Sequence, residues 1–208
     1  MFRNLFRPDS PLMITMTQIT DCIFLSMFWL VGCIPVITAG ASFAALYDAT
    51  FRAFRQGEKN SWQRFWYSFR QNWKSGIVPT LVAGAGAYAV ARILILIWNG
   101  AAVGEISMAV FTAAAVIGAL FLGMGGVLFA VLSRFENSAA MLLKNAVLLS
   151  LANLPRTLGL GVMNSVCVFL CLRYVYPLFF LPSLAALLGS LLLEPMFKPY
   201  MPVEDAAE

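Results

Sequence analysis

Charged residues inside apolar runs are the side chains in this sequence that could most readily do chemistry. Asp21, Asp48 and Arg92 each interrupt a stretch that is otherwise almost entirely apolar. An ionised side chain at a membrane centre costs about 2.5–3.5 kcal/mol on insertion scales, so such residues usually face protein or a water-filled cavity. Asp21 and Asp48 could relay a proton or a cation. The simpler interpretation is a structural ion pair, in which they face each other or Arg52 near the membrane surface.

Arg92 and Arg173 are the two basic residues that we do not expect on the cytoplasmic side of the membrane. Arg92 lies well inside its apolar run, and we expect Glu105, at the start of the next run, to pair with it. The two arginines could attract an anionic substrate. Long basic side chains that snorkel to the membrane surface are the simpler explanation.

A short block between two apolar runs combines groups that bind polar ligands. Pro35 ends one helix, and Thr38, Gly40 and Ser42 lead into the next. Hydroxyls, a glycine and a helix N-terminus can cradle a polar ligand, so all three residues are candidate binding residues. The same groups can also form a rigid connection, because non-helical backbone at membrane depth must have its polar groups satisfied. We favour the connection.

Catalytic constellations are missing from the sequence. The chain has no His, which excludes His-based acid–base catalysis, His-containing zinc sites and haem held by a proximal His. It also lacks the phosphate-binding G-x-x-x-x-G-K-[ST] motif. The four cysteines lie inside apolar runs, where cysteine acts as a small hydrophobe: Cys22, Cys33, Cys167 and Cys171. We therefore expect no enzyme, no cofactor and no metal site.

The elements that position these residues must be membrane helices. The 208 residues are 61% hydrophobic and only 12% charged, and the mean hydropathy is +0.81. Because a spanning helix needs about 20 apolar residues, we predict an all-α polytopic transmembrane bundle forming a single domain over residues 1–208. About six spans are predicted, at residues 14–36, 41–54, 77–98, 106–132, 158–174 and 178–193. An alternative has five spans, with the second helix re-entrant.

Aromatic residues follow a helical spacing in the polar segment 55–76. They share one face of the predicted helix, and they are Trp62, Phe65, Trp66, Phe69 and Trp73. Polar and basic residues occupy the rest of its surface. This pattern predicts an amphipathic helix in the headgroup plane, whose aromatic side contacts the membrane interface or docks a partner protein. We do not expect nucleic acid as a ligand.

Basic residues set the expected orientation. With six spans, most of the 14 Lys and Arg residues fall on one side, which the positive-inside rule places in the cytoplasm. Both termini, including the segment 1–13 and the tail 195–208, are then cytoplasmic. The first apolar run is too long for the core of a signal peptide, so we expect it to be a retained span.

A weak internal repeat is also predicted. The order of span, basic loop, lateral helix and span occurs twice along the chain. An Asn lies near the end of each lateral helix, with a basic residue shortly after it: Asn72 with Lys74, and Asn153 with Arg156. Transporters often contain such repeats, although helix packing alone can produce them.

Three segments carry a family resemblance. They are WLVGCIPVITAGASFAAL at 29–46, FWYSFRQNWKSG at 65–76 and LKNAVLLSLANLPRTL at 143–158. In these segments the chain resembles the YesL-like family of bacterial integral membrane proteins. The resemblance implies a multi-pass protein of the bacterial inner (cytoplasmic) membrane. The family has no defined biochemical role, and it occurs beside genes for carbohydrate uptake.

The occurrence of the family beside genes for carbohydrate uptake implies a function, but it identifies no binding or catalytic residues. We expect a non-enzymatic accessory or assembly component of a carbohydrate uptake system. Its partners would be the lipid bilayer and the permease subunits of a sugar importer. An autonomous small-solute transporter is the alternative, suggested by the weak repeat, the break at Pro35 and the few charges in the apolar runs.

Overall fold

The computed structural model describes residues 11–58, 60–104, 107–135 and 138–200, and within them every regular element is helical. The all-α prediction is therefore confirmed. Three short 3-10 turns accompany the α-helices at Val36–Thr38, Tyr176–Phe179 and Lys198–Tyr200. The α-helices are α1 (Pro11–Cys33), α2 (Ala39–Arg55), α3 (Ser61–Asn72), α4 (Ile77–Val103), α5 (Met108–Arg134), α6 (Ala139–Ala152), α7 (Leu154–Arg173) and α8 (Leu181–Phe197).

Four of the described helices, α1, α4, α5 and α7, are long and apolar enough to cross a membrane. Helices α6 and α8 are apolar but shorter, with 14 and 17 residues. In α4 only 6% of the apolar stretch is buried inside the protein, so its apolar surface faces outward, as expected against lipid. These helices indicate membrane insertion. The count of about six spans and the re-entrant alternative remain predictions.

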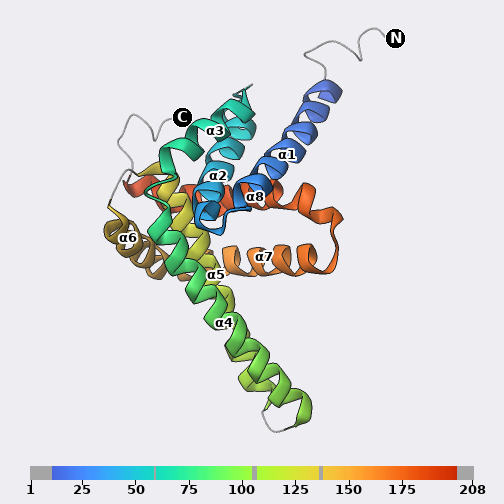
Figure 1. The fold of residues 1–208 in the computed structure, drawn as a ribbon, viewed down its shortest axis with the longest axis vertical. Coiled ribbons are helices and arrows are strands. Elements are labelled where there is room, and N and C mark those ends of the chain that lie inside the picture. The colour runs from blue at the N-terminus through green and yellow to red at the C-terminus, as the bar shows by residue number, and fades with distance from the viewer. Residues whose placement is uncertain (1–10, 59, 105–106, 136–137, 201–208) are drawn as a thin grey trace.

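Helix α2 lies at the centre of the bundle. It packs against α1, α3, α4, α5 and α8, and all but one of its residues from Gly40 to Thr50 are buried. In Figure 1 it stands between α1 and α3, while α4 and α5 form a long hairpin that projects away from the other helices. The small side chains of α2, such as Ala41, Ala44 and Ala45, allow its neighbours to approach closely. α2 is therefore surrounded mainly by protein.

Small residues also set the contact between α5 and α7. A Cβ atom on Gly161 would clash with the carbonyl oxygen of Ala119, and one on Gly123 would clash with that of Thr157. The two backbones therefore touch, as in small-residue crossings of membrane helices. Gly126 also packs against α7, whereas a Cβ on Gly125 would meet nothing within 4 Å.

The two segments of the predicted repeat have similar junctions. Asn72 and Asn153 each donate a side-chain hydrogen bond to the carbonyl four residues earlier, at 3.0 Å and 3.3 Å. Four residues after each Asn comes a small residue that contacts another helix, Gly76 against α2 and Thr157 against α5. The junctions are alike in these contacts, and the repeat itself stays a prediction.

Replacing Gly161 with Ala should destabilise the protein. The added methyl group must displace the backbone of α5, and overpacking of this kind costs about 1–3 kcal/mol. We expect a lower midpoint of thermal unfolding in detergent, followed by circular dichroism at 222 nm. Gly125→Ala is the matched control and should leave the midpoint unchanged or slightly raised. Equal midpoints for both variants would show that the α5–α7 contact is looser than described.

Candidate functional site

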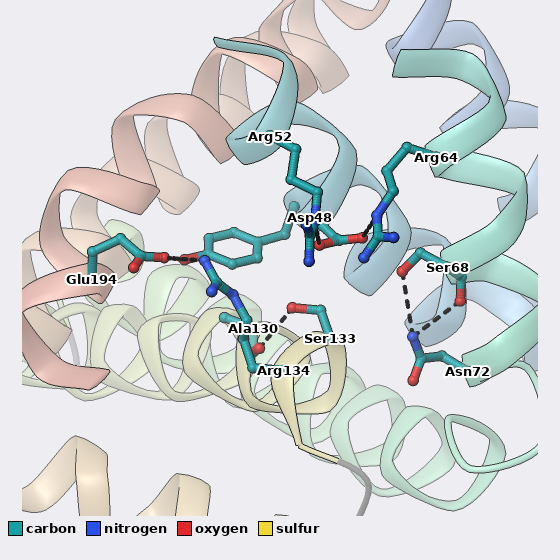
Figure 2. Close-up of polar contacts among 10 residues, drawn as sticks. Asp48, Arg52, Arg64, Ser68, Asn72, Ala130, Ser133, Arg134 and Glu194 are labelled. Atoms are coloured by element: carbon teal, nitrogen blue, oxygen red, sulfur yellow. Dashed lines mark hydrogen bonds and ion pairs between the residues drawn. The ribbon is translucent and has the colours of Figure 1, made fainter. Parts of the chain in front are cut away.

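Consecutive residues of α2 organise two polar networks at one end of the bundle. Asp48 is 1% exposed, and each of its carboxylate oxygens accepts a hydrogen bond from an arginine. The Nε atom of Arg52 lies 3.0 Å from Oδ1, and the Nε atom of Arg64 lies 2.6 Å from Oδ2. Figure 2 shows Arg52 from α2 and Arg64 from α3 flanking the carboxylate. We call these three residues the Asp48 clamp.

The second network begins at the neighbouring residue, Tyr47. Its hydroxyl donates to Oε1 of Glu194 at 2.9 Å, and Nη2 of Arg134 donates to the same oxygen at 2.6 Å. The Arg134 guanidinium also lies over the ring of Phe51, 4.4 Å from its centre. This network joins α2, α5 and α8 (Figure 2).

The two networks fix the helices relative to one another. A buried ion pair is a weak source of net stability, but removing one partner costs several kcal/mol because a buried charge is left uncompensated. Asp48 therefore holds α3 against α2, and Glu194 holds α5 against α8. Each network includes an ion pair between two different helices, Asp48 with Arg64 and Arg134 with Glu194, so each favours one packing of the bundle.

The predicted roles of the two aspartates are resolved in part. The expected pairing of Asp48 with Arg52 is found, and Arg64 is an additional partner. Asp21 does not face Asp48; its Oδ1 atom accepts a hydrogen bond from the hydroxyl of Ser61, at the start of α3, at 3.0 Å. α3 is thus tied to α1 as well as to α2. These contacts are those expected of structural ion pairing.

No sequence pattern indicates the pairing between Arg134 and Glu194, which are 60 positions apart. The available signal is that each is a single charged residue at the end of an apolar run. The amphipathic pattern of segment 55–76 predicts that its basic residues, Arg64 among them, face outward, whereas in the structure Arg64 turns inward to Asp48.

The aromatic face of α3 is divided. Phe65 is fully buried, and its ring packs against Phe28 of α1 with centroids 6.0 Å apart. Trp66 and Phe69 are half-buried in the same cluster, whereas Trp62 and Trp73 are 52% and 46% exposed. The prediction of one outward aromatic face is therefore wrong for Phe65, because α3 packs that part of its surface on α1 and α2.

The block from Pro35 to Ser42 uses its polar groups internally. The Thr38 hydroxyl lies 2.8 Å from the carbonyl oxygen of Gly32, to which it can donate, and the Ser42 hydroxyl donates to the Thr38 carbonyl at 3.1 Å. The backbone N–H of Gly40 donates to Thr80 of α4 at 3.0 Å. These bonds favour the rigid connection over a ligand-binding loop.

The remaining candidates do not join the networks. Arg92 and Arg173 are both exposed, and neither forms an ion pair with a residue that the structure describes. The guanidinium of Arg173 lies 5.6 Å from the ring centre of Tyr174. Glu105, the expected partner of Arg92, lies outside the described residues.

An apolar cavity of about 480 Å³ lies next to the second network. It is lined by residues of α1, α2, α4, α5, α7 and α8, and it reaches Tyr47. Few polar side chains line it, among them Thr80 and Asn164. Thr80 already accepts from Gly40 and donates to the Gly76 carbonyl. The cavity therefore suits an apolar group rather than a polar solute.

Replacing Asp48 with Asn should lower stability strongly. The amide cannot accept from both guanidinium groups and compensate their charge, and a hydrogen bond to a charged group contributes about 1.5–3 kcal/mol. Thermal unfolding in detergent should show a much lower midpoint. Glu58→Gln, which removes an exposed carboxylate shortly after α2, should leave the midpoint unchanged. Similar midpoints for both variants would contradict the role assigned to Asp48.

Comparison with known proteins finds one family model that matches part of the chain. A family model described as "Protein of unknown function, DUF624" matches residues 22–92. The matched segment runs from within α1 through α2 and α3 into α4, and it contains the whole Asp48 clamp. No curated protein and no solved structure matches the chain. The match supports a relationship to a family whose function is not known.

Proposed function

We propose that this chain is a non-enzymatic integral membrane protein that serves as an accessory or assembly component of a membrane transport system. The observation that carries the proposal is the outward surface of α3, which presents aromatic and basic side chains from a helix that the bundle holds in place. The other face of α3 is anchored through Arg64, Phe65 and Ser61.

The composition of this surface suits protein recognition. Its members are half-exposed aromatic residues and exposed basic residues, and we call the set the α3 surface: Trp62, Tyr67, Arg70, Trp73 and Lys74. Trp, Tyr and Arg are the residue types that most often dominate binding energy at interfaces. Because α3 is fixed by buried contacts, a partner would find these side chains on an ordered helix and on the turn that follows it, where Trp73 and Lys74 lie, and binding would cost less conformational entropy.

The link to carbohydrate uptake rests on the resemblance to the YesL-like family. On that basis the partners that we propose are permease subunits of a sugar importer in the bacterial inner membrane. The positive-inside rule supports a cytoplasmic position for the α3 surface, since it contains Arg70 and Lys74.

An autonomous small-solute transporter is the second candidate, and the cavity of about 480 Å³ is the observation that favours it. A sugar needs hydrogen-bonding partners when it leaves water, because unpaired hydroxyl groups are costly to bury. The apolar lining supplies few of them. For this reason we rank transport of a polar solute through this cavity below the accessory role.

Affinity purification of the tagged protein from its native membrane in mild detergent tests the accessory role. We expect a transport permease to co-purify, and the double substitution of Trp62 and Trp73 by Ala to reduce its recovery at least tenfold, as for hot-spot residues. Trp98→Ala is the matched control, because Trp98 is 49% exposed but lies on α4. A protein that purifies without a permease would contradict the proposal, as would equal recovery with both variants.

A further inference from the structure

Arg52 and Arg64 contact Asp48 in a way that leaves much of each guanidinium group unused. Each donates through its Nε atom, at 3.0 Å and 2.6 Å, to a different carboxylate oxygen. A guanidinium group also carries N–H donors on its two terminal nitrogens. Neither pair of terminal nitrogens forms a hydrogen bond with any residue that the structure describes. One buried carboxylate thus holds two sets of free donors side by side.

The charges in the clamp do not balance. Two guanidinium groups share the single carboxylate of Asp48, which leaves one positive charge without a partner. The Asp48 side chain is only 2% exposed, whereas those of Arg52 and Arg64 are 35% and 23% exposed. A carboxylate nearby, Glu58, forms no ion pair with either arginine. The free donors can therefore be reached from outside, and partial burial strengthens their attraction for an anion.

The surroundings of the clamp are those of a membrane interface. The Arg64 guanidinium lies 5.2 Å from the ring centre of Tyr67, which is 59% exposed. Trp62 on the same helix is 52% exposed. Tyr and Trp are enriched at the level of lipid headgroups, where one side of the ring is apolar and the other is wet.

We infer that Arg52 and Arg64 form a binding site for a phosphate group, supplied by the headgroup of an anionic phospholipid. The planar donor sets of arginine match the oxygens of a phosphate, and each can form two parallel hydrogen bonds. Basic pockets between membrane helices bind lipid headgroups in this way. The site does not rest on the proposed accessory role, because the donors of Arg52 and Arg64 need no protein partner; Trp62 and Tyr67, which lie beside it, belong to the α3 surface as well.

The test measures the midpoint of thermal unfolding of the full chain in detergent with three additives at equal concentration: phosphatidylglycerol, phosphatidylcholine and inorganic phosphate. Phosphatidylglycerol should raise the midpoint of the wild-type protein more than phosphatidylcholine, because the choline cation of phosphatidylcholine offsets the charge of its phosphate. In the double variant R52K/R64K each lysine keeps its charge beside Asp48 but lacks the second donor set. Its affinity for phosphatidylglycerol should fall about tenfold or more. The control Arg70→Lys makes the same change at an exposed site of α3.

Two results would overturn the inference. One is an equal rise with phosphatidylglycerol and phosphatidylcholine; the other is an unchanged response to phosphatidylglycerol in R52K/R64K. If inorganic phosphate alone reproduces the effect of phosphatidylglycerol, the site stands and free phosphate is its ligand. Native mass spectrometry of the wild-type protein gives a second readout that needs no variant. Equal retention of the two lipids there would also overturn the inference.

Discussion

The buried carboxylate of Asp48 is the constraint on which the arrangement of the N-terminal half depends. It lies on the most enclosed helix of the bundle, where an uncompensated charge would be costly. The two arginines that compensate it come from α2 itself and from α3, so α3 must lie against α2. Ser61 adds a hydrogen bond from α3 to Asp21 on α1. The contacts on the inward face of α3 therefore determine which of its side chains face outward.

The same end of the bundle contains a second ionic contact, between Arg134 and Glu194. Tyr47 connects it to α2, next to Asp48 in the chain. The polar groups of four helices thus converge around one turn of α2, while the surfaces of α1, α4 and α7 are largely apolar and exposed. This separation is typical of a membrane protein whose charged end lies at the interface. It also explains why a site with free donors occurs at that end.

Much of the fold could be predicted because helix length and apolar composition report directly on the membrane. The helices and the break at Pro35 followed from such patterns. The position of α2 could not be predicted from its apolar stretch, because burial by protein and burial by lipid select similar residues. The small side chains of α2 indicate that other helices pack closely against it, but they do not identify which helices these are.

The candidate site was less predictable. Asp48 with Arg52 is a local pair at helical spacing, and the sequence suggested it. Arg64 and Glu194 bind partners that are distant in the chain, and no local pattern identifies such contacts. The aromatic residues of α3 are also only partly predictable. Their spacing shows that they share one helix face, but it does not show which part of that face other helices bury. Phe65 is buried because α1 and α2 lie on that side.

A double-mutant cycle on Asp48 and Arg64 tests the central claim most directly. The free energy of unfolding is measured for the wild-type protein, Asp48→Asn, Arg64→Gln and the double variant. If Asp48 holds α3 through Arg64, the two substitutions should be coupled by about 1–3 kcal/mol, as expected for residues in direct contact. Effects that add to within about 0.5 kcal/mol would contradict the account, because they would show that α3 keeps its place without this contact.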